Sequence, residues 1–272
     1  MLKIPNFLLT ENIFKLRKTK YYGPGIFNYS VLLTKLPFYM LILVLFRKAI
    51  SRIVAGKKKF PIELAGVSAG INIFHRIDLN GEGFNLVFDY LRAYHKTVKK
   101  PLDTILEVGC GPGYLGFVFL SLGLCKKLIL VDINSNALEV VNKTIKNNNL
   151  KNVECYLSDG LTDVPENCCD LIISNPVHFD EGVEIKKWRH HSTDELIARD
   201  KDWSFHKNIY SNSGRVLKPN GSMLIQENVL AGDNTGLFRD MIEESGGSFV
   251  DKVISNPLTP ESPMYYIFSK FN

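Results

Sequence analysis

The sequence predicts an α/β fold in which seven strands form one largely parallel sheet, with the last strand antiparallel. Two observations predict it: a glycine-rich turn joins a buried strand to a helix, and apolar strands alternate with helices from Thr104 onward. We expect an α-rich N-terminal extension or lid over residues 1–75 and the sheet domain over residues 76–272.

The composition indicates a globular protein with ample material for a core, because 45% of the 272 residues are hydrophobic and 22% are charged. A net charge of +5 permits an acidic partner without implying one. The odd number of cysteines and the absence of C-x-x-C spacing indicate reduced thiols in a cytoplasmic protein, with no metal site. The five cysteines are Cys110, Cys125, Cys155, Cys168 and Cys169.

The most apolar run of the N-terminal extension is Leu36–Phe46, which is too short for a transmembrane helix of about 20 residues. It is interpreted either as a buried helix or homodimer face, or as a membrane-surface helix supported by Lys57–Lys59. Residues 62–77 are expected to form two short strands or a covering loop. Apolar side chains at helical spacing then predict a helix over residues 83–99.

The glycine-rich turn lies between a predicted strand at Thr104–Val108 and a predicted helix at Tyr114–Leu122. Such a unit opens nucleotide-binding sheets, and residues 111–116 match the dinucleotide pattern G-x-G-x-x-G. However, Pro112 lacks an N–H group for a phosphate, and Glu107 places a carboxylate just before the turn. A cationic ligand without phosphates therefore suits this turn better.

The remaining elements continue the alternation of strands and helices. Predicted strands are Lys127–Asp132, Val153–Leu157, Cys169–Ser174, Ser222–Asn228, Ser248–Ile254 and Met264–Phe271. Predicted helices are Asn134–Asn149, Asp194–Val216 and Gly236–Glu244, with a turn at Lys218–Gly221. Asp132, Asp159 and Asn175 each follow a strand, so they converge with the glycine turn on one crevice beyond the carboxyl ends of the strands.

The string E-V-G-C-G-P-G at residues 107–113 resembles motif I of the class I S-adenosylmethionine-dependent methyltransferases. The resemblance covers about residues 75–272 and implies their Rossmann-like sheet, with S-adenosylmethionine as cofactor. Asp132, at a suitable spacing after the glycine turn, is expected to accept from ribose hydroxyls or to serve as a turn residue. The resemblance assigns Asp159 to the adenine, unless it is a plain turn residue. The expected cofactor-binding residues are Glu107, Gly109, Cys110, Gly111, Gly113, Asp132, Ile133, Asp159, Gly160 and Asn175.

The pair Asn175-Pro176 resembles the start of the N-P-P-Y/F motif of amide- and amine-directed N-methyltransferases, which include the release-factor glutamine methyltransferases. Proline holds the Asn175 side chain and the neighbouring carbonyls rigid, so that these oxygens can accept the N–H groups of a planar nitrogen. The sequence departs from the motif because Val177 replaces the second proline and His178 precedes Phe179.

Three roles for this segment stay open. Asn175 and the Pro176 carbonyl orient an amide or amine, His178 is the general base of a small-molecule O- or N-methyltransferase, or Asn-Pro is only a structural turn. Phe179 would stack on a planar substrate, and His190 and His191 either contact the substrate or lie on an exposed loop.

The expected acceptor is a protein, peptide or small molecule; nucleic acid is disfavoured but not excluded. A NAD(P)-dependent reductase and an inactive docking protein are the alternatives from other classes.

Overall fold

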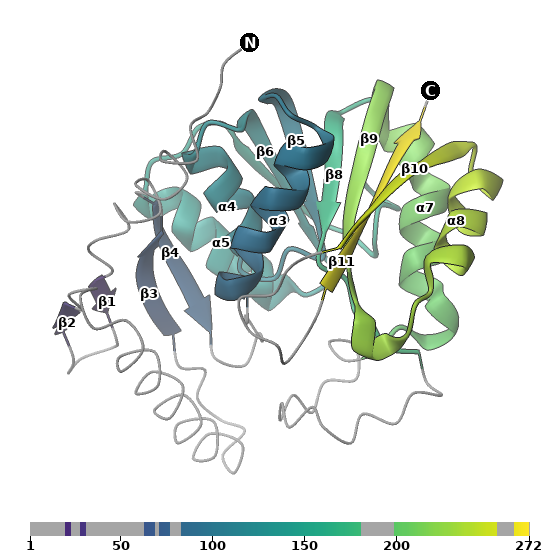
Figure 1. The fold of residues 1–272 in the computed structure, drawn as a ribbon. Coiled ribbons are helices and arrows are strands. Elements are labelled where there is room, and N and C mark those ends of the chain that lie inside the picture. The colour runs from purple at the N-terminus through teal and green to yellow at the C-terminus, as the bar shows by residue number, and fades with distance from the viewer. Residues whose placement is uncertain are drawn as a thin grey trace.

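A computed structural model of the chain describes residues 20–22, 28–30, 63–68, 71–76, 83–180, 199–254 and 264–271. Its centre is a seven-stranded sheet in the order β10-β11-β9-β8-β5-β6-β7 (Figure 1). Neighbours from β9 to β7 pair in parallel, and β11 is antiparallel to both β9 and β10. The predicted fold class is confirmed. The strands are β5 Leu102–Val108, β6 Cys125–Asp132, β7 Val153–Leu157, β8 Cys169–Ser174, β9 Leu217–Asn228, β10 Gly247–Ile254 and β11 Met264–Phe271.

The strand order reverses between β5 and β8. From β5 the chain proceeds to β6 and β7 on one side, then returns to place β8 and β9 on the other side. In open α/β sheets the ligand binds at such a reversal, outside the carboxyl ends of the strands. The topology therefore places the crevice beside Val108 and Ser174, the last residues of β5 and β8.

Helices cover both faces of the sheet. The first face carries α3 Gly83–Thr97, α4 Tyr114–Ser121 and α5 Ser135–Asn147, and the second carries α7 Ser204–Val216 and α8 Thr235–Glu244 (Figure 1). Two apolar clusters fill the layers, one around Tyr90 and Phe117 and the other around Tyr210 and Phe238. The predicted helices at 83–99, 114–122, 134–149 and 236–244 are confirmed to within about two residues.

The helix predicted from Asp194 is wrong at its start. α7 begins only at Ser204, after a short 3-10 turn at Lys201–Trp203. Asp202 and Trp203 have φ angles of 53° and 55°, which a continuous right-handed helix does not allow. Asp200 instead accepts from the backbone N–H of Phe205 at 2.8 Å, which satisfies a donor at the helix start. The first part of the predicted helix, residues 194–198, lies outside the described residues.

The predicted turn at Lys218–Gly221 is an irregularity within β9. Cys169 pairs with Leu217 but Leu171 pairs with Ser222, so the residues between are looped out of the register. Asn220 has a φ of 63°, which asparagine adopts more readily than most residues.

The described part of the N-terminal extension is a small sheet in the order β2-β1-β3-β4. β3 Glu63–Ser68 and β4 Ile71–Arg76 pair antiparallel, so the two strands considered for residues 62–77 are present. β1 Lys20–Tyr22 and β2 Asn28–Ser30 complete it, and β4 lies against α4 and α5. Leu36–Phe46 and Lys57–Lys59 lie outside the described residues. Within the described ranges, no helix is long and apolar enough to cross a membrane.

Candidate active site

The glycine turn is held in shape by the carboxylate of Asp132 at the end of β6. Gly109, Gly111 and Gly113 have φ angles of 65°, 50° and 76°, a region that favours glycine. The Gly111 N–H donates to Asp132 Oδ2 at 2.7 Å, and the Asn134 N–H donates to Oδ1 at 2.8 Å. Burial raises the pKa of Asp132, although these N–H groups oppose the rise.

Glu107 lies behind the glycine turn. Its side chain is buried, and Oε2 accepts from the Gly116 N–H of α4 at 2.8 Å. Burial raises the pKa of Glu107 to about 8, with a smaller contribution from the charge of Asp132 and against the effect of the Gly116 N–H. Glu107 is therefore largely protonated at neutral pH, and it fastens α4 to β5.

The backbone of the turn is open to a ligand. Apart from its chain neighbours, no atom of the described residues lies within 4 Å of where a Cβ on Gly111 would stand. A Cβ on Gly113 would press on Phe117 and Leu130. At the end of β6, the apolar side chain of Ile133 is 53% exposed. A curved backbone, a carboxylate and an exposed apolar side chain fit a ligand that has both polar and planar apolar parts.

Tyr90 of α3 joins the strands at the point where their order reverses. Its hydroxyl accepts from the Ser174 N–H at 3.0 Å and lies at the carbonyls of Ser174 and Leu224. Ser174 Oγ in turn donates to the carbonyl of Val108 at 2.8 Å. These contacts fix the end of β8 against β5 and β9, and thereby fix the position of Asn175.

Asn175 is exposed, and its amide is held by the buried ring of His178. Nε2 of His178 lies 2.9 Å from Asn175 Oδ1, and Nδ1 lies 3.4 Å from Glu227 Oε2. The predicted residues Asn175 and His178 are thus brought together.

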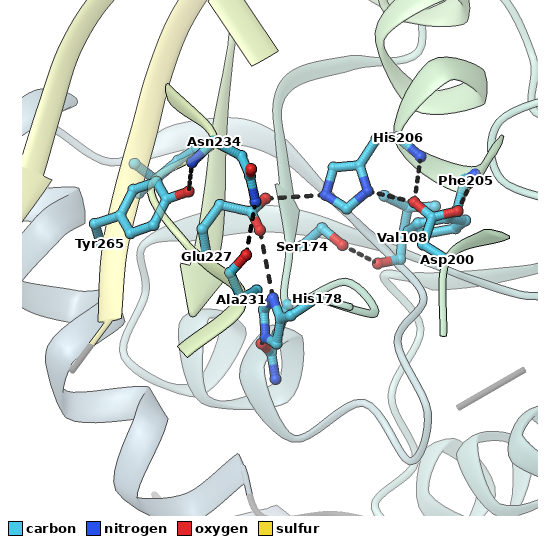
Figure 2. Close-up of polar contacts among 12 residues, drawn as sticks. Val108, Ser174, His178, Asp200, Phe205, His206, Glu227, Ala231, Asn234 and Tyr265 are labelled. Atoms are coloured by element: carbon cyan, nitrogen blue, oxygen red, sulfur yellow. Dashed lines mark hydrogen bonds and ion pairs between the residues drawn. The ribbon is translucent and has the colours of Figure 1, made fainter. Parts of the chain in front are cut away.

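The polar contacts continue from His178 into the protein (Figure 2). Glu227 Oε1 lies 3.0 Å from His206 Nε2, and His206 Nδ1 lies 2.5 Å from Asp200 Oδ2. Burial works against a charge on His206, but Glu227 and Asp200 outweigh it and raise its pKa to about 9. Burial likewise favours neutral carboxyls, yet His206 holds the pKa of both Asp200 and Glu227 below their usual range.

Sequence reasoning missed Asp200, His206 and Glu227. A signal for Glu227 was present, because β9 is a fifth parallel strand and Glu227 is its penultimate residue. The rule that selected Asp132 and Asn175 therefore applies to Glu227 as well. His206 carries no comparable signal, since a single histidine within a helix is most often a core residue.

The other predicted site residues lie in different surroundings. The Asp159 side chain is exposed after β7, and Gly160 next to it has a φ of 52°. Cys110 and Phe179 are buried, and the ring of Phe179 meets that of His178 edge to face at a centroid distance of 6.5 Å. His190 and His191 lie outside the described residues. Within the described part of the chain, no group of three or more His, Cys, Asp or Glu residues is arranged to hold a metal ion.

The fold and the family match define an S-adenosylmethionine-dependent methyltransferase domain. Residues 91–243, more than half of the chain, match the methyltransferase small domain family, and the chain belongs to this family.

Its relatives differ in the acceptor that they are named for. The chain is 36% identical over 97 residues to ribosomal RNA small subunit methyltransferase C of Haemophilus influenzae, covering 36% of this chain and 28% of that protein. It is 31% identical over 125 residues to release factor glutamine methyltransferase of Borreliella burgdorferi, covering 45% of this chain and 43% of that protein. The chain thus spans less than half of the length of either relative.

Solved structures share the fold. M. jannaschii TYW2 in complex with AdoMet superposes with a TM-score of 0.56 at 15% identity, over 77% of this chain and 86% of that chain. A putative transferase from Pyrococcus horikoshii gives a TM-score of 0.55 at 14% identity, over 99% of this chain and 95% of that chain.

Proposed function

We propose that the protein transfers a methyl group from S-adenosylmethionine to a planar amide or amine nitrogen. The observation that carries this proposal is the exposed amide of Asn175 at the carboxyl end of β8, where the strand order reverses. The cofactor supplies an electrophilic methyl group when bound. The chain itself would bind, orient and electrostatically assist the nitrogen that attacks it.

The cofactor would lie along the turn from Gly109 to Gly113. The N–H and carbonyl groups of the turn, with the backbone of Asn175 nearby, are proposed to hold the methionine part. The carboxylate of Asp132 would hold the ribose hydroxyls. Ile133, with Asp159 and Gly160, would border the adenine. Glu107 would support the turn from behind, since its carboxyl is buried and bonded to Gly116.

Asn175 and the Pro176 carbonyl would accept the N–H groups of the acceptor. A nitrogen that attacks the methyl group gains positive charge, and acceptors fixed around its hydrogens stabilise that charge. The geometry favours this role over direct proton removal by His178, because Nε2 of His178 faces Asn175 and the ring is only 7% exposed.

The nitrogen that accepts the methyl group is proposed to belong to an amide of a protein or peptide. One relative is named for a glutamine of a release factor, and another for ribosomal RNA. Glutamine side chains and RNA bases both offer planar nitrogens, so the same site chemistry serves either. Residues 76–272 would form the catalytic domain, and residues 1–75 would act as a lid that selects the acceptor.

The test is methyl transfer from labelled S-adenosylmethionine into a cell extract, followed by separate protease and nuclease treatment. Label released by protease supports the protein acceptor, and label released by nuclease would replace it with RNA. Asn175→Ala is expected to lower transfer by about 100-fold, because it removes a fixed acceptor of the N–H group. Cofactor affinity, measured by calorimetry, should change by less than about 3-fold, which is roughly 0.6 kcal/mol.

Asp170→Asn is the matched control. Asp170 lies at the amino end of β8, where it bonds to the Thr104 N–H and to Lys218, so its substitution should leave transfer unchanged. Full activity of Asn175→Ala together with a loss in His178→Ala would instead establish His178 as the base.

A further inference from the structure

Four buried side chains form a continuous line (Figure 2). The last of them, His178, contacts the amide of Asn175. In order they are Asp200, His206, Glu227 and His178, and they come from the segment before α7, from α7, from β9 and from the loop after β8. We propose that Glu227 is a positioning residue that, through His178, determines which atom of the Asn175 amide faces the methyl acceptor. This inference rests on the proposed role of Asn175.

The far end of the line fixes the charge on Glu227. Both ring nitrogens of His206 face carboxylate oxygens, so each carries a proton and the ring is an imidazolium. Asp200 accepts in addition from the N–H of Phe205 at 2.8 Å and from the N–H of His206 at 3.1 Å, so it is a carboxylate. The imidazolium between them keeps Glu227 ionised as well, although Glu227 is only 1% exposed.

The ionised Glu227 then selects the tautomer of His178. Its Oε2 accepts only from a protonated Nδ1, which places the proton of a neutral His178 on that nitrogen and leaves a lone pair on Nε2. In the structure Asn175 Oδ1 faces Nε2, so this lone pair would accept from the Nδ2 group of Asn175 only after a half-turn of the amide. The Asn175 oxygen is then turned away from the ring, where it is free for the N–H of an acceptor.

A second proton on His178 reverses this arrangement. A protonated Nε2 donates to Asn175 Oδ1, which is the contact present at 2.9 Å, and the oxygen is then occupied. A half-turn of the Asn175 amide exchanges its oxygen and its nitrogen. The presence or absence of a proton on His178 Nε2 therefore decides which of the two atoms faces the ring. The acceptor would therefore be recognised when His178 is neutral and protonated on Nδ1.

Among the described residues, no other charged side chain contacts His178 or Glu227. Besides the two histidines, the titratable groups that interact with Glu227 are the hydroxyls of Tyr90 on α3, Tyr210 on α7 and Tyr265 on β11. Burial raises the pKa of all three tyrosines, so they stay neutral near pH 7. Glu227 is thus the anion that biases the ring of His178.

The first test is the tautomer of His178 in the full chain, read from ¹⁵N chemical shifts and assigned by the loss of its signals in His178→Gln. For the neutral ring we expect a proton on Nδ1 and none on Nε2. A neutral ring with its proton on Nε2 would overturn the proposal. This measurement requires no acceptor and no altered Glu227.

The second test is a double-mutant cycle for methyl transfer. Glu227→Gln removes the anion and with it the bias on the ring, and we expect kcat to fall about 10-fold with an unchanged dissociation constant for S-adenosylmethionine. In a His178→Ala background, Glu227→Gln should have no further effect. If Glu227→Gln lowers kcat equally in the wild type and in the His178→Ala background, Glu227 does not act through His178 and the proposal is refuted.

The two proposals fail in different ways. If Asn175→Ala retains full transfer, the proposed function is wrong whatever Glu227 does. If Asn175→Ala abolishes transfer but Glu227→Gln leaves kcat unchanged, only the positioning role is wrong.

Discussion

At the residue scale, Gly111 and Gly123 offer a direct test of the cofactor turn. Both have left-handed φ angles, 50° and 69°, and a Cβ on either would meet no atom within 4 Å in the described part of the chain, its chain neighbours aside. Gly111→Ala and Gly123→Ala should each lower the free energy of unfolding by about 1 kcal/mol, because alanine is strained in this conformation. Only Gly111→Ala should weaken S-adenosylmethionine binding, by about 10-fold or more in calorimetry, since its methyl group would occupy the ligand's side of the turn. Equal affinities in the two variants would place the cofactor elsewhere.

The single residues whose positions could be predicted are those that local sequence places at the ends of strands. The glycine turn, Asp132 and Asn175 stand at strand ends, and the position of a strand end can be predicted from hydrophobic pattern alone. The proton on Glu107 could not be predicted, because it depends on burial beneath α4. Nor could the contacts of His206, since its two carboxylate partners lie on different segments that only the folded chain brings together.

At the scale of elements, α3 acts on the site through one hydroxyl group. Hydrophobic spacing predicts this helix and its buried face but not the partner of each side chain, so the contact of Tyr90 with Ser174 emerges only from the structure. Tyr94 provides a comparison one turn later, where its hydroxyl donates to the Lys100 carbonyl at 2.6 Å, away from the strand ends that form the site.

Tyr90→Phe and Tyr94→Phe should therefore differ in function more than in stability. Each removes one largely buried hydroxyl and should cost about 1–2 kcal/mol of unfolding free energy, measured by urea titration. Tyr90→Phe should also lower methyl transfer about 10-fold, because Ser174 and the following Asn175 lose a fixed position. Tyr94→Phe should retain full transfer. Equal transfer by both variants would show that the end of β8 is held without the hydroxyl.

At the scale of the whole molecule, the buried groups of His206 and Glu107 each make stability fall as the pH rises. His206 has a folded-state pKa of about 9, above its usual 6.5, so its stabilisation is complete below about pH 6.5 and is lost as the pH rises through 9. Glu107 is raised from 4.5 to about 8, so its contribution is complete below pH 4.5 and is lost through pH 8. Asp200 and Glu227 act in the opposite sense at low pH, since their lowered pKa values stabilise the fold above the unfolded-state values and lose that effect in acid.

The variant Glu107→Gln separates the contributions that His206 and Glu107 make to the pH dependence of the unfolding free energy. This variant keeps an oxygen for the Gly116 N–H but cannot ionise, so its unfolding free energy should fall less steeply than that of the wild type between pH 5 and pH 8. The difference in slope should approach 1.4 kcal/mol per pH unit, the value for one proton. Above about pH 9 the two curves should run parallel, because Glu107 is then ionised in the folded and the unfolded wild type and His206 titrates in both variants. Urea titrations at each pH measure this, and parallel curves from pH 5 onward would mean that Glu107 is already ionised in the folded protein.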